Sequence, residues 1–224
     1  MDTLKQHELF EIEVLDRMRS FKLLGPLVFG GDTMLRLCHQ LNRFSADLDF
    51  WFIKPFDEET YFSNFKHRFE NTFEMTDAQI KHFTLLFELR SGSFPKRLKI
   101  EIRRGVQQLD FQDQIAFSRF ASKQVVLKVI TLEQAMQNKI NAFMDRGEVR
   151  DGFDIEFLLR KGINLPEMSA ARVKKFTEKL SQLKEMDFKV KLGSILEKDI
   201  REYYIVQKFA FLEEAVMNSH LDHT

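Results

Sequence analysis

The sequence has little cysteine, proline or glycine and no excess of charge: 224 residues contain one Cys, four Pro and nine Gly, with 34 basic and 34 acidic side chains. A single cysteine excludes an internal disulfide framework and is typical of a reducing compartment. Balanced charge excludes a global field that attracts nucleic acid, so such contacts would need a local basic patch. No apolar run reaches the roughly 18 residues of a membrane span, and early charges argue against a signal peptide. We expect a cytoplasmic protein without a membrane partner.

Phenylalanine is abundant instead, with 24 residues. An apolar content of 44% and a charged content of 30% describe an ordinary globular chain. The phenylalanines predict a core of aromatic rings in place of leucine and valine. The alternative is that some of them stack on nucleotide bases. Cys38 lies among leucines on a predicted helix, so we expect a structural thiol and not a nucleophile.

Periodicity predicts an α/β region over residues 1–130 and a helical region over residues 131–224. The predicted strands are 27–29, a strand starting at Asp47, 83–89, 98–103 and 124–130, with a hairpin turn at Ser91–Pro95. The predicted helices are 3–22, 34–41, 57–73, 131–146, 151–161, 169–186 and a last stretch to about 218. Thr33 and Asp151 are expected as N-caps of two of these helices.

Two aspartates carry the first functional signal. Asp47 and Asp49 flank Leu48 on a strand, so their carboxylates project from one face about 7 Å apart along the chain. Paired carboxylates repel each other unless a cation lies between them, and hard cations prefer oxygen ligands. The pattern therefore favours a metal site, with a solvated acidic strand face as the alternative.

A glycine pair precedes these acids. Gly30 and Gly31 close a buried strand, a helix follows, and the acidic strand returns. Glycines let backbone approach a phosphate closely, and a helix N-terminus presents unpaired N–H groups. A triphosphate held there would carry its metal ions to Asp47 and Asp49.

Residues 29–37 and 43–50 together resemble the first motif of the polymerase-beta-like nucleotidyltransferases. The likeness is greatest to the AbiEii/AbiGii toxin family, which shows Gly-Gly-Thr-x-Leu and then Arg-x-Ser-x-Asp-Leu-Asp-Phe. The resemblance implies an α+β fold with a short mixed sheet and a helical C-terminal part. It also implies a toxin of a type IV toxin–antitoxin or abortive-infection system. Such a toxin would be a metal-dependent nucleotidyltransferase that moves an NMP from an NTP to an acceptor hydroxyl.

The resemblance also implies a set of site residues. Two Mg²⁺ ions, with Mn²⁺ as an alternative, would be held by Asp47, Asp49 and Glu101. From its strand alone, Glu101 is equally well read as a solvent-facing residue, and Asp110 and Asp113 are weaker candidates in an expected loop. The nucleotide-binding residues would be Gly30, Gly31, Thr33, Arg43, Ser45 and Lys139.

Two later segments, 137–146 and 150–155, resemble the family's Lys-x-x-Ala … Arg helix and its Arg-Asp-x-x-Asp segment. By position alone, Lys139 lies at the edge of an apolar stripe, where a lysine usually extends to water. Asp154 is expected to face inward, where a carboxylate needs a partner. The resemblance implies that Lys139 holds triphosphate oxygens. Asp154 would orient the acceptor hydroxyl, accept its proton or fix Lys139, so that residues 131–224 complete the active site.

Asp32 departs from the family pattern because it separates Gly31 from Thr33. It either repels phosphates or caps the helix and points away. Its presence favours an alternative function, a catalytically weak or inactive nucleotide-binding or antitoxin-binding module. The implied partners are an NTP, an RNA or tRNA acceptor and a cognate antitoxin. RNA would need a basic patch, for which Lys96–Lys99 with Arg103–Arg104, or Lys174–Lys175, are candidates against a plain solvated face.

Overall fold

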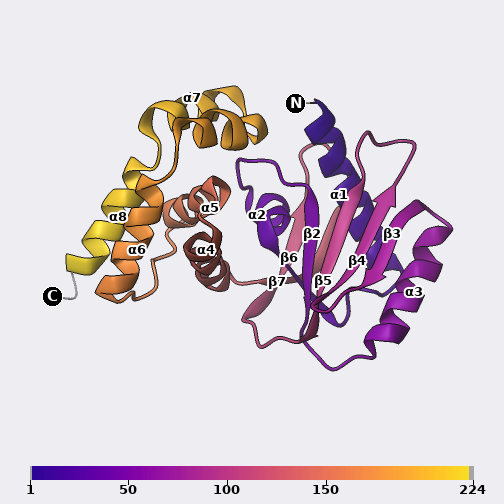
Figure 1. Ribbon diagram of the computed structural model, residues 1–224. Coiled ribbons are helices and arrows are strands. Elements are labelled where there is room, and N and C mark those ends of the chain that lie inside the picture. Colours follow the sequence, from indigo (N-terminus) through magenta and orange to yellow (C-terminus); the bar gives the residue numbers. More distant parts are fainter. Residues whose placement is uncertain (1, 222–224) are drawn as a thin grey trace. The chain divides into compact units, whose positions relative to one another are not determined.

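The computed structural model describes residues 2–221. The chain divides into two compact units, Met1–Thr131 and Leu132–Thr224. The first contains a mixed β-sheet with helices, and the second is helical (Figure 1). This architecture confirms the predicted α+β class. No helix within residues 2–221 is long and apolar enough to cross a membrane.

The elements of the first unit are α1 (Asp2–Ser20), β1 (Leu27–Gly30), α2 (Gly31–His39), β2 (Asp47–Phe52), α3 (Glu58–Glu70), β3 (Glu74–Ile80), β4 (Thr84–Arg90), β5 (Leu98–Val106), β6 (Phe111–Phe117) and β7 (Gln124–Ile130). Those of the second unit are α4 (Leu132–Arg146), α5 (Val149–Arg160), α6 (Ala170–Ser181), the π-helix η1 (Asp187–Leu192), the 3₁₀-helix η2 (Gly193–Ile195), α7 (Lys198–Gln207) and α8 (Ala210–Leu221).

The sheet has the strand order β3-β4-β5-β2-β1-β7-β6. The central strand β2 is antiparallel to β1 and parallel to β5. The predicted hairpin is the antiparallel pair β4–β5. Because β2 is hydrogen-bonded on both edges, the register of its side chains is fixed by both neighbours.

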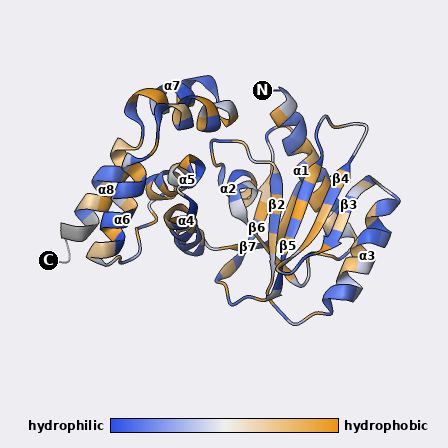
Figure 2. Cartoon of the chain, viewed as in Figure 1, coloured by the Kyte–Doolittle hydropathy of each residue, from blue (hydrophilic) through white to orange (hydrophobic). Residues whose placement is uncertain are grey.

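The core lies on one face of this sheet and combines aromatic rings with leucine, isoleucine and valine side chains. Leu48, Phe50 and Phe52 of β2 are buried there. The ring of Phe65 on α3 stacks on Phe87 of β4 with centroids 3.9 Å apart, and Phe69 of the same helix makes an edge contact with Phe21, the residue that follows α1. Many phenylalanines are buried, as predicted, but the expectation that they replace leucine and valine is wrong, because leucine and valine are also abundant among the buried residues. Figure 2 shows many hydrophobic residues along the strands of the sheet.

Several local predictions are wrong. Strands β3 and β6 were not predicted, and Asp113 lies within β6 instead of a loop. Helix α2 begins at Gly31, with Gly30 as its N-cap, so Thr33 does not cap it. Helix α5 begins at Val149, with Glu148 as its N-cap, so Asp151 lies in the first turn. In both helices the polar side chain expected to cap has a partner elsewhere, as described below.

Candidate functional site

The acids predicted on β2 lie on the face of the sheet opposite its core. Along β2 buried residues alternate with half-buried ones, and Asp47 and Asp49 belong to the half-buried set. In the parallel register Asp47 pairs with Lys99 of β5, and Asp49 pairs with Glu101. Side chains at paired positions project to the same face. The structure therefore brings Asp47, Asp49 and Glu101 together on two neighbouring strands.

Lys99 lies between two of these acids. Its Nζ is 3.3 Å from Asp47 Oδ2 and 3.5 Å from Glu101 Oε1. Partial burial lowers the pKa of Lys99, but the charges of Asp47 and Glu101 outweigh that effect, and the net pKa is raised. All three side chains remain open to solvent, with exposed fractions of 46% for Asp47, 37% for Lys99 and 34% for Glu101. Two carboxylates thus converge on one accessible cation.

The two glycines allow the third carboxylate to lie against the start of α2. Gly31 has a φ of +71°, and a Cβ built there would lie 2.2 Å from Asp49 Oδ2. A Cβ on Gly30 would lie 2.3 Å from the ring of Trp51. Any larger residue at either position would therefore displace a side chain of the acidic face. Asp49 can lie next to the N-terminus of α2 because residues 30 and 31 are both glycine.

The next residues of this segment hold α2 in place. Thr33 is buried and donates its hydroxyl to the carbonyl of Asp47, with Oγ1 and O 2.6 Å apart. Asp32 forms an ion pair with Arg43, in which Oδ2 and Nη2 are 2.6 Å apart. Arg43 is only 1% exposed, and Ser45 is half-buried. The negative charge of Asp32 beside the glycines is therefore compensated by a buried guanidinium.

A small cleft of about 200 Å³ opens beside the acids. Asp49, Trp51, Glu101 and Arg103 contribute to its lining. Trp51 and Arg103 are paired across β2 and β5, two residues further along the strands than Asp49 and Glu101. Lys99, Trp51 and Arg103 were not predicted as residues of the catalytic site. The alternation of β5, which puts residues 99, 101 and 103 on one face, was a signal that could have identified them.

The donor chemistry of this face fits a hard divalent cation, because all its candidate ligands are carboxylate oxygens. Within residues 2–221, no three Asp, Glu, His or Cys side chains converge closely enough to hold a metal ion as they stand. The reason is visible in the contacts: Lys99 lies between Asp47 and Glu101, and Asp49 lies against Gly31. The ammonium of Lys99 occupies the position between the carboxylates of Asp47 and Glu101.

A buried polar cluster on α1 supports the start of β2. His7 Nε2 is 2.8 Å from the carbonyl oxygen of Ala46, and Glu8 forms a buried ion pair with Arg36 of α2 at 2.9 Å. Burial lowers the pKa of His7. Burial also raises the pKa of Glu11 well above its ordinary value, and the nearby charge of Glu8 adds to that effect. These contacts fix α1 and α2 around the residue that precedes Asp47.

Lys139, on α4 of the second unit, is held by two acids of α5. Its Nζ is 2.6 Å from Asp154 Oδ2 and 3.6 Å from Asp151 Oδ1. Both aspartates have no solvent exposure, and Lys139 is 9% exposed at its side chain. Arg146 donates two hydrogen bonds to the carboxylate of Asp151, each 2.7 Å long, which explains why Asp151 is not a helix cap. The contact with Asp154 is the one required if Asp154 fixes Lys139.

The first unit thus combines a mixed sheet, a helix that begins at Gly31, and paired acids on the central strand β2. Two solved structures from Helicobacter pylori share the fold of most of this chain. JHP933 is 22% identical with a TM-score of 0.56, and the match covers 92% of this chain and 93% of that one. A protein described provisionally as a nucleotidyltransferase is 23% identical with a TM-score of 0.58, covering 93% and 96%.

The family model described as nucleotidyl transferase AbiEii toxin, type IV TA system, matches residues 13–204. The chain therefore belongs to the AbiEii family of nucleotidyltransferase toxins, and the predicted family and enzyme class are confirmed. No curated protein matches the chain. Membership in a type IV toxin–antitoxin family implies an antitoxin partner and a nucleotide substrate.

Proposed function

We propose that this toxin transfers an NMP from an NTP to a hydroxyl group of RNA, with the acidic face of β2 and β5 as its catalytic centre. In this reaction the acceptor oxygen forms a bond to the α-phosphorus, the bond to pyrophosphate breaks, and the hydroxyl loses its proton. The observation that carries the proposal is the placement of Lys99 between Asp47 and Glu101, 3.3 and 3.5 Å from their oxygens. This arrangement supports the proposal that the acidic face binds a cation.

Asp47, Asp49 and Glu101 are the proposed metal ligands. Two Mg²⁺ ions bound there, or Mn²⁺ in their place, would neutralise triphosphate charge and activate the acceptor hydroxyl. Gly30 and Gly31 would let the phosphates approach the N-terminus of α2, where backbone N–H groups and the helix dipole favour anions. Arg103 is exposed in the cleft beside Asp49 and Glu101, where it could contact the same phosphates.

The nucleotide-binding residues fall into two groups in this proposal. Thr33 and Arg43 act through the backbone and through Asp32, because both are buried and committed to those partners. Ser45 remains a candidate for direct contact. Lys139 would hold triphosphate oxygens, and Asp154 would fix Lys139, as their 2.6 Å contact supports. The ion pair of Asp32 with Arg43 removes the reason for expecting repulsion of phosphates, which favours an active enzyme over an inactive binding module.

The test is label transfer from each α-labelled NTP to total RNA in the presence of Mg²⁺. We expect transfer by the wild-type chain and a loss of about 10²-fold or more in Asp49→Asn, because a ligand that stabilises charge in the transition state is removed. Asp113→Asn is the matched control. Asp113 lies on the edge strand β6 and was itself a candidate acid, so unchanged transfer in this variant would also remove that candidate.

Nucleotide binding without transfer from any NTP would contradict the proposal. The result would then favour the alternative, a module that binds nucleotide or antitoxin without turnover. Full activity of Asp49→Asn would place the catalytic centre elsewhere.

A further inference from the structure

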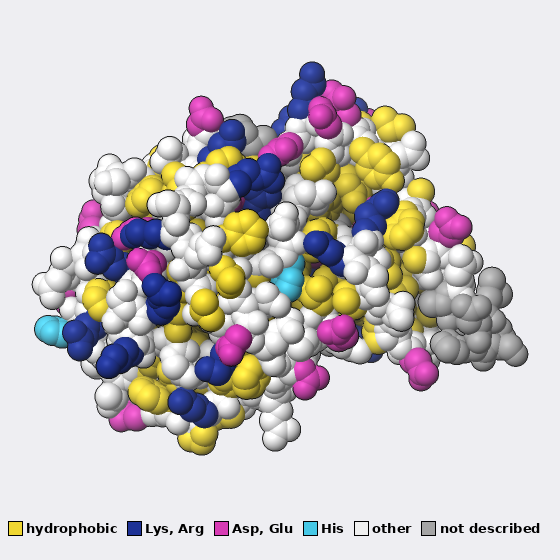
Figure 3. Space-filling model, turned by 180° about the vertical axis from the view of Figure 1, so that it is seen from behind, with side chains coloured by type: hydrophobic (Ala, Val, Ile, Leu, Met, Phe, Trp, Pro, Cys, Tyr) yellow, Lys and Arg dark blue, Asp and Glu magenta, His cyan; other side chains and the backbone are white. Residues whose placement is uncertain are grey.

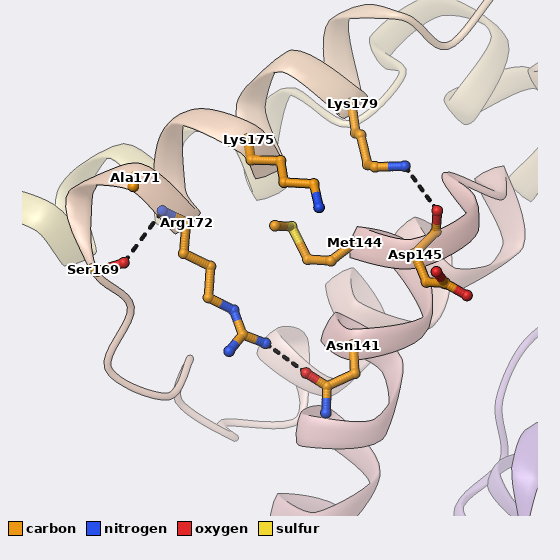
Figure 4. A pocket seen from close by; sticks show the side chains of 8 residues that line it. All are labelled: Asn141, Met144, Asp145, Ser169, Ala171, Arg172, Lys175 and Lys179. Carbon is orange, nitrogen blue, oxygen red and sulfur yellow. Dashed lines mark hydrogen bonds between the residues drawn. The ribbon is translucent and has the colours of Figure 1, made fainter.

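A groove in the second unit lies between α4 and α6 and has no part in the chemistry proposed above. Its volume is about 640 Å³. The α4–α6 groove is lined by Asn141, Met144, Asp145, Ser169, Ala171, Arg172, Lys175 and Lys179 (Figure 4). On the molecular face shown in Figure 3, basic, acidic and hydrophobic side chains are interspersed. The formal net charge of the chain is zero. Three basic side chains in one groove are therefore a local concentration of positive charge.

The basic side chains form a row. Arg172, Lys175 and Lys179 are three and four residues apart on α6, so they project from one face of the helix over about 10 Å. Asp145 is the acidic residue of the lining, and Figure 4 shows its carboxylate directed away from Lys175. The row therefore keeps an excess of positive charge in the groove.

The two ends of the row are held in place by α4. Arg172 donates from Nη2 to Asn141 Oδ1 at 2.5 Å, and Lys179 donates to the carbonyl oxygen of Asp145 at 3.1 Å. Lys179 also lies over Gly147, where a Cβ would be 3.6 Å from its Nζ. Lys175, between them, is exposed and points into the groove. Fixed cations need less ordering on binding than free surface lysines.

The start of α6 adds to this positive field. Ser169 caps the helix by accepting from the backbone N–H of Arg172, and the first turn contains no acidic residue. The positive end of the helix dipole therefore lies at the same groove as Ser169 and Ala171. Both the row of cations and the helix N-terminus favour an anion.

The chemistry of the lining selects the kind of anion. Met144 and Ala171 are the apolar residues of the lining, whereas a protein partner would need a larger apolar centre with aromatic or aliphatic anchors. One phosphate cannot contact every cation of a row of about 10 Å, but a nucleic-acid strand carries one phosphate per nucleotide, so successive phosphates can face the row. We propose that the α4–α6 groove binds the sugar–phosphate backbone of a nucleic-acid strand.

The inference rests on the proposed function only for the choice of RNA as that strand. The two lysines of the basic patch predicted at Lys174–Lys175 differ in their position relative to the groove. Lys175 lines the groove, whereas its neighbour Lys174 is exposed but is not part of the lining. The two lysines are adjacent, equally charged and on the same helix, so one is a matched control for the other.

The experiment measures binding of a labelled single-stranded RNA of mixed sequence to the full chain by fluorescence anisotropy over a range of salt concentrations, without NTP. Lys175→Glu should weaken binding about tenfold, and Lys175→Ala should reduce the slope of log affinity against log salt by about one. Lys174→Glu should change affinity by less than about twofold. Equal effects at both positions, or no effect at either, would overturn the proposal.

Asp49→Asn separates this inference from the proposed chemistry. This variant should lose label transfer and still bind RNA as the wild type does. If Lys175→Glu weakens RNA binding while no NTP supports transfer, the groove stands and the proposed function fails. If RNA affinity is unchanged in Lys175→Glu while binding of an acidic protein is lost, the groove serves a protein partner and the inference is wrong.

Discussion

Each unit of this toxin contains a lysine between two carboxylates, but one of these triads is open to water and the other is buried. In the first unit, Lys99 lies 3.3 and 3.5 Å from Asp47 and Glu101, and all three side chains are at least one third exposed. In the second unit, Lys139 lies 2.6 and 3.6 Å from Asp154 and Asp151, and both aspartates are fully buried.

The difference in burial gives the two triads different uses. An exposed ion pair contributes little to stability, because water competes for both charges. Its cation can therefore be exchanged for another at small cost. A buried pair cannot lose one member without leaving an uncompensated charge in the interior. The first triad is suited to admit a ligand cation, and the second is suited to hold one lysine in one position.

The largest expected effect comes from making the same substitution in both triads. Lys139→Met leaves Asp154 buried without its cation and should lower the free energy of unfolding by about 3–5 kcal/mol. Lys99→Met should lower it by less than about 1 kcal/mol. Urea denaturation followed by circular dichroism measures both. Recovery of much of the loss in the double variant Lys139→Met/Asp154→Leu would attribute it to the unpaired charge, and equal losses at Lys99 and Lys139 would remove the distinction.

The next effect concerns the glycine against which Asp49 lies. Gly31→Ala combines a strained φ of +71° with a Cβ 2.2 Å from Asp49 Oδ2, so it should move the acid and abolish label transfer. Gly105→Ala has a similar φ of +74° with nothing within 4 Å of the new Cβ, and it isolates the strain, about 1–2 kcal/mol. Gly92→Ala, with neither feature, should match the wild type. Transfer by Gly31→Ala at the wild-type rate would show that Asp49 need not lie there.

Local patterns predicted the acids of the first triad and missed its lysine. The alternation of β2 and β5 put Asp47, Asp49 and Glu101 on solvent-facing sides, because a period of two depends only on neighbouring residues. It could not show that β2 and β5 pair in parallel with Lys99 opposite Asp47, since that register depends on contacts between residues about 50 positions apart. The ion pair of Asp32 with Arg43 was missed for the same reason.

The missed strands have a related cause. Strands β3 and β6 are at the two edges of the sheet and are largely exposed, so their sequences lack a regular alternation of apolar and polar residues. The expected caps failed because Thr33 and Asp151 form tertiary contacts, with the Asp47 carbonyl and with Arg146. Local propensity was outweighed by partners elsewhere in the fold. The family motif was identified without any of these contacts, because it depends on residue order alone.

Glu11 is a buried acid outside both triads, and its protonation should make the stability of the chain depend on pH. Burial, followed by the charge of Glu8, raises the pKa of Glu11 well above 4.5, and Glu11 Oε1 has no hydrogen-bond partner within the described residues. A raised pKa means that the stability from the protonated form is present below pH 4.5 and is lost as pH rises toward the folded-state pKa. Glu11→Gln keeps the neutral form at every pH. Its free energy of unfolding relative to wild type should therefore increase from pH 4.5 upward, and a constant difference would contradict the raised pKa.

Lys99→Met should have a small effect on stability but a clear effect on the binding of divalent metal ions. In Lys99→Met the ammonium no longer lies between Asp47 and Glu101, so both carboxylates become available to a divalent cation. Without competition from Lys99, affinity for Mg²⁺ or Mn²⁺ should increase by about three- to tenfold, as expected from the modest worth of an exposed ion pair. Isothermal titration calorimetry with Mn²⁺ measures this affinity directly.

Lys66→Met is the control for that titration, because it removes another exposed lysine, 3.9 Å from Glu70 on α3, far along the chain from the acidic face. It should leave metal affinity unchanged. Asp49→Asn combined with Lys99→Met should reverse the gain, since one proposed ligand is lost. If Lys99→Met instead weakens metal binding, then Lys99 helps to assemble the site, and the open triad is not an exchangeable cation site. Lys99 and Lys139 would then differ in burial but not in whether a ligand cation can replace them.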